Sequence, residues 1–81
     1  MKITIQGLNN RITVIFVKES DTIKEGKNKY KEETGITDSL QWKFGGGPLE
    51  DDKTFEYYYI QDEDQITSNT LREGGKVKLK F

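Results

Sequence analysis

Gly74 and Gly75 are the residues of this chain whose type and spacing suit a chemical role. They follow Leu71-Arg72-Glu73 near the end of the sequence. A glycine pair has no Cβ atom to obstruct a narrow enzyme channel, so an extended segment that ends in one suits a carboxylate that is threaded, activated and transferred. The pair predicts processing after Gly75 and conjugation of its carboxylate to an amine.

Six residues follow the pair, and they give it a second interpretation. Residues 76–81 read Lys-Val-Lys-Leu-Lys-Phe, an alternation of polar and apolar residues that is typical of a half-buried strand. Val77, Leu79 and Phe81 would each contribute roughly 1.5 to 3 kcal/mol if fully buried. In that case the glycines form a turn, and residues 76–81 are a final strand, not a removable extension.

Missing residue types limit the chemistry that the chain itself performs. It contains no cysteine and no histidine, so it has no disulfide, no thiol nucleophile, no imidazole base and neither of the usual zinc ligands. Acidic residues cluster at 50–52 and 62–64, but without the regular spacing of a calcium-binding loop. We therefore expect a protein that is not an enzyme, with no catalytic residue, no cofactor and no metal.

The composition predicts one small folded domain with a well-solvated surface. Charged residues make up 33% of the chain and hydrophobic residues 32%, against typical values of roughly a quarter and a half. The net charge of −1 argues against nucleic acid as a partner, and Lys76, Lys78 and Lys80 alone would provide little affinity for RNA. Without a long apolar run, we expect no signal peptide and no membrane span. The expectation is a monomer, cytoplasmic or nuclear or both, whose partners are proteins.

Local patterns predict the elements that would position these residues. Residues 2–6 and 12–17 are strand-like segments on either side of a turn and predict a hairpin. Thr22 and Glu25 have the spacing of a capping box at the start of a helix, and Gly35 suits its left-handed end. The predicted order is two strands, the helix, an extended region over 36–44, a short helical turn or strand over 54–60, and a last strand.

A set of residues distributed along these elements is more specific than the pattern itself. The set comprises Ser20-Asp21-Thr22-Ile23, Lys27, Lys29, Gly35-Ile36, Leu49-Glu50-Asp51, Lys53-Thr54-Phe55, Tyr58 and Ile60-Gln61. With these residues the chain resembles ubiquitin and its relatives, which share an α+β β-grasp fold with a mixed sheet wrapped around one helix. Apart from one deletion near residues 37–39, the resemblance runs without gaps from Met1 to Gly75. It implies a ubiquitin-like domain over 1–75, with its diglycine where conjugating members carry theirs, and a C-terminal extension over 76–81.

Departures from the family bear on partners. Ubiquitin's aliphatic recognition patch is matched here only at Leu8, because Lys43 and Asn69 occupy the other two positions. A partner that buries this patch would have to desolvate an ammonium and an amide, so common ubiquitin receptors should bind poorly. Of the candidate lysines for chain linkage, the resemblance leaves Lys27 and Lys29.

The hairpin offers a second surface. The resemblance implies that Ile15 and its alternate neighbours turn inward, which leaves Ile12, Val14 and Phe16 on the outer face. Three outward apolar residues form a stripe that a soluble monomer does not normally expose, and we expect it to bind a partner together with Leu8, Lys43 and Asn69. The alternative is a one-residue bulge, which would bury the stripe because a slip inverts every side chain.

Two functions follow from these alternatives. We favour the strand over residues 66–71 and a free diglycine. The resemblance places the small Gly26 and Ser68 near Trp42, which is larger than the family's usual leucine, and a core tolerates such a volume-conserving exchange. The chain is then a ubiquitin-like modifier precursor, served by a processing protease and by its own activating and conjugating enzymes, because Leu71 and Glu73 replace basic residues of ubiquitin's tail. The alternative is a non-conjugated ubiquitin-like domain that acts as a protein–protein docking module.

Overall fold

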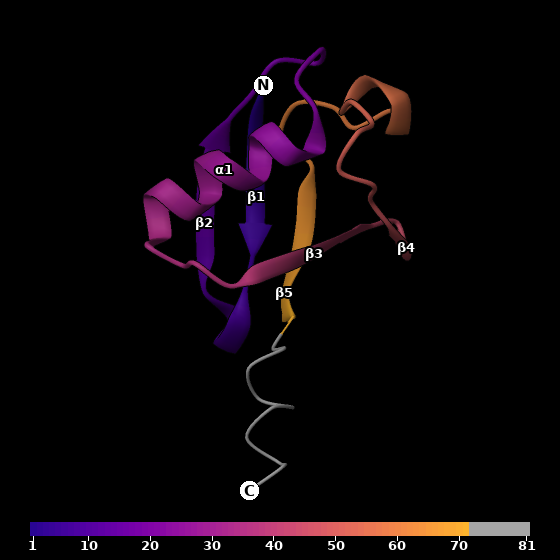
Figure 1. The fold of residues 1–81 in the computed structure, drawn as a ribbon. Coiled ribbons are helices and arrows are strands. Elements are labelled where there is room, and N and C mark those ends of the chain that lie inside the picture. Colours follow the sequence, from indigo (N-terminus) through magenta and orange to yellow (C-terminus); the bar gives the residue numbers. More distant parts are fainter. Residues whose placement is uncertain (72–81) are drawn as a thin grey trace, which may run out of the picture.

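Five strands, one α-helix and two 3-10 turns make up residues 1–71, the part of the chain that the computed structural model describes (Figure 1). The predicted hairpin and helix are present. The elements are β1 (Lys2–Gln6), η1 (Leu8–Asn10), β2 (Ile12–Phe16), α1 (Ile23–Thr34), β3 (Ser39–Phe44), β4 (Gly47–Pro48), η2 (Glu56–Tyr58) and β5 (Gln65–Leu71).

The strands form one mixed sheet in the order β2-β1-β5-β3-β4. β5 is parallel to β1 and antiparallel to β3, and the β1–β2 and β3–β4 pairs are antiparallel. α1 crosses one face of this sheet (Figure 1). The expected α+β fold, a mixed sheet wrapped around one helix, is confirmed.

The helix begins and ends as its sequence predicts. The Thr22 hydroxyl accepts a hydrogen bond from the Glu25 backbone N–H at 3.2 Å, and the Glu25 carboxylate accepts one from the Thr22 backbone N–H at 2.8 Å. This reciprocal pair is the predicted capping box. At the other end, Gly35 has a φ of 77°, a conformation that glycine adopts without strain.

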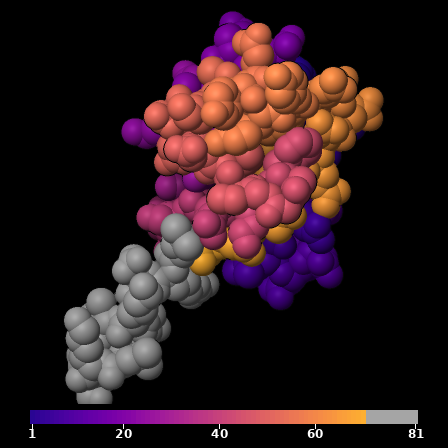
Figure 2. Space-filling view, turned by 90° about the vertical axis from the view of Figure 1, so that its right-hand side faces the viewer, coloured from indigo at the N-terminus to yellow at the C-terminus, as the bar shows by residue number. Residues whose placement is uncertain are grey.

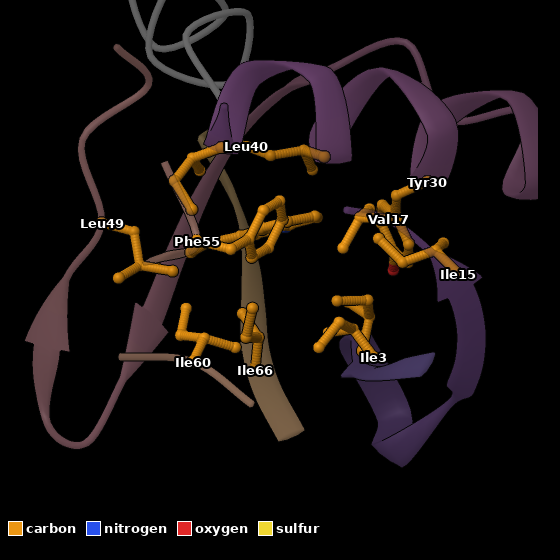
Figure 3. Packing of buried hydrophobic residues seen from close by; sticks show 12 residues of the cluster. Ile3, Ile15, Val17, Tyr30, Leu40, Leu49, Phe55, Ile60 and Ile66 are labelled. Atoms are coloured by element: carbon orange, nitrogen blue, oxygen red, sulfur yellow. The ribbon is translucent and has the colours of Figure 1, made fainter. Parts of the chain in front are cut away.

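The core lies between the helix and the sheet (Figure 3). Trp42 is fully buried, its indole N–H donates to the Ser68 hydroxyl at 3.0 Å, and its ring meets that of Tyr30 edge-on with centroids 5.9 Å apart. A Cβ atom on Gly26 would lie 2.6 Å from Cζ of Phe55. The expectation that Gly26 and Ser68 are small because large side chains pack beside them is therefore confirmed.

The segment between β3 and β5 differs from prediction in detail. β3 begins at Ser39 instead of residue 36, and Gly47–Pro48, which belongs to no predicted element, forms the short strand β4. Gly45 and Gly46 have φ values of 61° and 85°, and this tight reversal brings the chain back alongside β3. Of the two alternatives predicted for residues 54–60, a helical turn or a strand, the structure has the turn, η2. The pink to orange surface in Figure 2 belongs largely to this part of the chain.

The partly buried Tyr58 holds this segment in place through a hydrogen bond. The Tyr58 hydroxyl accepts a hydrogen bond from the backbone N–H of Glu50 at 2.8 Å, while Tyr57 and Tyr59 lie exposed at the surface. No helix within residues 1–71 is long and apolar enough to cross a membrane.

Candidate functional site

The predicted processing site, Gly74 and Gly75, and the extension over 76–81 lie outside the described residues. The strand that leads to them is described. Gln65–Leu71 lies between β1 and β3, with Ile5 paired to Ile66 and Leu40 paired to Thr70. Ile66 is fully buried. The strand favoured over residues 66–71 is thus present, and it holds the central position of the sheet.

Leu8, Lys43 and Asn69 lie exposed, as their assignment to a partner-binding surface requires. Lys43 pairs with Thr67 on β5, and Asn69 pairs with Gln41 on β3. Alternation along the strands places Lys43 and Asn69 opposite the buried Trp42 and Ser68, on the outer face of the sheet. This face therefore presents an ammonium and an amide, while the exposed Leu8 lies in the 3-10 turn η1 between β1 and β2.

The hairpin stripe, defined as Ile12, Val14 and Phe16, faces outward. Ile12 and Phe16 are 54% and 65% exposed and Val14 is half-buried, whereas Ile15 and Val17 are buried. The predicted orientation is confirmed, and the bulge that would have buried the stripe is wrong. The pairing of β1 with β2 continues one residue to one residue from Lys2↔Phe16 to Gln6↔Ile12.

The stripe also lies on an edge of the sheet, which the sequence reasoning missed. β2 is the last strand on its side within residues 1–71. The backbone groups of Val17 bond to Met1, and the Arg11 carbonyl accepts from Gly7 at 2.8 Å. Because hydrogen-bonded and non-bonded pairs alternate in an antiparallel ladder, the N–H and C=O groups of the stripe residues point away from β1, to the open edge. The order of strands in the fold is the signal that would have revealed this.

A groove of about 390 Å³ runs between β2 and α1. Val14, Ile15 and Phe16 line one side, and the charged residues Lys29, Glu32 and Glu33 line the other. The Lys29 ammonium donates to the Phe16 carbonyl at 2.7 Å and lies 3.9 Å from the Asp21 carboxylate. The open edge thus has an apolar face on one side and a charged helix on the other.

The two candidate linkage lysines have different environments. Lys27 is only 8% exposed, and its ammonium donates to the Leu40 carbonyl at 2.9 Å and to the Asp51 carboxylate at 2.6 Å. Its amine would have to leave both partners before it reacted. The Lys29 side chain is 48% exposed, so its amine is the more accessible of the two.

Residues 1–71 contain no group of three or more acidic, histidine or cysteine side chains that could hold a metal ion. The acidic residues at 51, 62 and 64 instead accept hydrogen bonds, from the Lys27 ammonium and from the backbone N–H groups of Lys2 and Gln61. Their carboxylates therefore act within the fold as acceptors that tie loops to strands and to the helix.

The comparison with known families agrees with this geometry. A sequence model of the ubiquitin family matches residues 3–71, which is most of the 81-residue chain. The matched range ends where β5 ends, and it includes the helix, the sheet and the loops that Tyr58 and Lys27 hold in place. The chain belongs to the ubiquitin family.

Proposed function

We propose that the chain is a ubiquitin-like modifier precursor. A protease hydrolyses the peptide bond after Gly75 and releases residues 76–81. The new Gly75 carboxylate is activated as an adenylate, passed through thioesters and joined to a target amine. The chain is the substrate of this chemistry and not its catalyst.

The observation that carries the proposal is the position of β5. Gln65–Leu71 is paired on both sides, with β1 and β3, so the central place in the sheet is filled by residues that precede the diglycine. All five described strands and every described buried side chain belong to residues 1–71. In a member of the ubiquitin family, a diglycine directly after this strand suits a transferable C-terminus.

The surface supports dedicated enzymes over those of ubiquitin. Lys43 and Asn69 are exposed on the outer face, where a partner that buries an aliphatic patch would have to desolvate them at a cost of about 1 to 3 kcal/mol for each unpaired polar group. Leu71 and Glu73 also differ from the basic tail of ubiquitin. The processing protease and the activating and conjugating enzymes are therefore proposed to be specific to this protein.

The test uses the full chain, tagged at its N-terminus, in an ATP-supplemented extract of the cells that produce it. Intact-mass spectrometry should show loss of residues 76–81, and higher-mass conjugates should carry a branched peptide that ends in Gly75. Gly75→Ala should block both events, whereas a chain that ends at Gly75 should conjugate without the protease. The proposal would be rejected if the full chain kept residues 76–81 and the chain that ends at Gly75 formed no conjugates.

A second candidate is a non-conjugated docking module, and the exposure of Ile12 and Phe16 favours it. Large apolar side chains that face solvent on one stripe are typical of an interaction surface. Val14→Ser combined with Phe16→Ser should abolish capture of a protein partner while the circular dichroism spectrum stays unchanged. Partner capture that survives the double substitution would count against docking through the stripe.

A further inference from the structure

A pocket of about 590 Å³ lies where the η1 turn, the helix and β5 meet. A volume of this size is typical of sites that hold a small organic ligand. None of the residues that line the pocket is acidic, and one of them, Arg11, is a cation. The pocket shares no lining residue with the groove beside β2, so it is a separate feature of the surface.

The hydroxyl group of Tyr30 belongs to this pocket. The Tyr30 ring packs edge-on against Trp42 in the core, and the residue is only 2% exposed. A Cβ atom on Gly7 would lie 2.6 Å from the hydroxyl oxygen, so glycine at this position leaves room for that oxygen. The hydroxyl has no hydrogen-bond partner within residues 1–71, and in this part of the chain no side-chain polar atom that is shut off from solvent lacks a partner. The hydroxyl therefore opens onto the pocket, where a ligand can supply the partner that a buried phenol normally has.

Ser68 adds a second buried hydroxyl to the same pocket. It is 4% exposed, and its oxygen accepts a hydrogen bond from the Trp42 indole N–H at 3.0 Å. Because an indole N–H can only donate, the hydroxyl hydrogen of Ser68 has to find its acceptor elsewhere. Two side chains that are more than nine-tenths buried thus offer O–H donors to one pocket, which favours a ligand that accepts hydrogen bonds.

Arg11 makes the pocket positive. Its backbone is held beside the η1 turn, because its N–H donates to the Leu8 carbonyl at 3.1 Å and its carbonyl accepts from the Gly7 N–H at 2.8 Å. Within residues 1–71 its guanidinium forms no salt bridge. A guanidinium binds carboxylates through paired, charge-assisted hydrogen bonds. Leu8 and Ile36 line the same pocket, so apolar surface lies next to the charge and the hydroxyls.

We propose that this pocket binds a small organic carboxylate. The Tyr30 and Ser68 hydroxyls donate to its oxygens, and Arg11 balances its charge. Leu8 and Ile36 cover its apolar part. A carboxylate leaves water only where donors replace its hydration, and donors bond more strongly to an ionised acceptor than to a neutral one. The site is independent of whether the diglycine is processed, because every lining residue belongs to the described domain.

Sodium benzoate is a suitable probe, because it joins one carboxylate to a small apolar ring. We would titrate it into the ¹⁵N-labelled full chain at constant ionic strength and record two-dimensional NMR spectra. The backbone amides of Gly7, Arg11 and Ser68 should show saturable shifts, with a Kd on the order of 1 mM for so small a ligand. Benzyl alcohol has the same ring without the charge, and it should bind at least about tenfold more weakly, equivalent to about 1.4 kcal/mol.

Three substitutions test the assignment of the donors. Tyr30→Phe keeps the ring and should weaken benzoate binding at least about tenfold, and Arg11→Gln should weaken it as well, while neither should change the binding of benzyl alcohol. Lys24→Gln removes a charge from an exposed position of α1 outside the pocket, and it should leave the Kd for benzoate unchanged. Circular dichroism checks that each variant is folded.

Three results would overturn the proposal. The first is a full chain that shows no saturable shifts at these amides up to about 20 mM benzoate, well above the millimolar range of a weak site. The second is equal affinity for benzoate and benzyl alcohol, which would make the pocket merely apolar. The third is benzoate binding that the Arg11→Gln variant, or a folded Tyr30→Phe variant, retains at the strength of the parent chain.

Discussion

At the scale of single residues, Gly26 shows how the core limits the helix. A glycine inside α1 costs about 1 kcal/mol relative to alanine in helix propensity. Yet a Cβ atom at this position would lie 2.6 Å from Phe55 Cζ and 3.2 Å from Trp42 Cζ3, and both of those rings are fully buried. The rings of Phe55 and Trp42 therefore fill the space that a side chain at position 26 would need.

Gly26→Ala should destabilise the domain in spite of the better helix propensity of alanine. Overpacking typically costs about 1 to 3 kcal/mol, and we expect this cost to exceed the gain in propensity because both rings are fully buried. Urea unfolding measures the change. Asn28→Ala, at an exposed position of the same helix, is the matched control and should change the free energy of unfolding by less than about 0.5 kcal/mol. An alanine at position 26 that stabilised the domain would contradict this account of the packing.

The two candidate linkage lysines should also react differently. Lys27 is held by the Leu40 carbonyl and the Asp51 carboxylate, while the Lys29 side chain is 48% exposed. Acetylation of the folded chain with a limiting reagent, followed by peptide mass spectrometry, should modify Lys29 before Lys27. Lys24, also exposed on α1, serves as the reference for a free amine. Once the domain is unfolded in denaturant, Lys27 and Lys29 should react at similar rates; if they already do so in the folded chain, Lys27 is not held as described.

These residues also show what can be inferred from sequence alone. The small partners of Trp42 were predictable because a volume exchange appears as residue types in the sequence. The partners of Lys27 were not, because Leu40 and Asp51 reach it only through the tertiary fold. The sequence therefore indicates that Lys27 matches a family position and is a candidate for linkage, but it does not show that Lys27 is buried.

At the scale of elements, boundaries follow from local chemistry where that chemistry is strong. The capping box and Gly35 define both ends of α1, as predicted. β4 was not predicted because Gly47 and Pro48 have low strand propensity. These two residues pair with β3 because Gly45 and Gly46 reverse the direction of the chain next to that strand. The edge position of β2 was also not predicted, because it depends on the order of all five strands in the sheet and not on the residues of β2 alone.

The start of α1 provides a test at this scale. Thr22→Ala removes the hydroxyl that accepts the Glu25 N–H and should cost about 1 kcal/mol of stability, with a range of about 0.5 to 2. Thermal unfolding followed by circular dichroism measures the loss. Thr22→Ser retains the hydroxyl and should remain close to the parent chain. Equal losses from both substitutions would mean that the methyl group, not the cap, is the stabilising part of Thr22.

At the scale of the whole molecule, the sequence contains two segments that could each form the last strand of the sheet. Local pattern favours residues 76–81, with three alternating apolar side chains, over residues 66–71, where only Ile66 is a clear core residue. The sheet nevertheless has Gln65–Leu71 between β1 and β3. Ser68 is suited to this buried position because it bonds to the Trp42 indole N–H, a contact between residues that are distant in sequence. Resemblance to a family predicted this arrangement, whereas local periodicity did not.

Truncation after Gly75 tests what the completed sheet implies for the molecule. A chain of residues 1–75 keeps every described strand and every buried core residue. We expect its free energy of unfolding to change by less than about 1 kcal/mol, a small part of the 5 to about 15 kcal/mol typical of a domain. If residues 76–81 were instead the final strand, loss of Val77, Leu79 and Phe81 would remove roughly 1.5 to 3 kcal/mol for each buried side chain. Urea unfolding of the full chain and of the chain of residues 1–75 separates these outcomes. If residues 76–81 form the final strand, the truncated domain would be largely unfolded. A domain that needs these residues to fold is not a modifier that is used after they are removed.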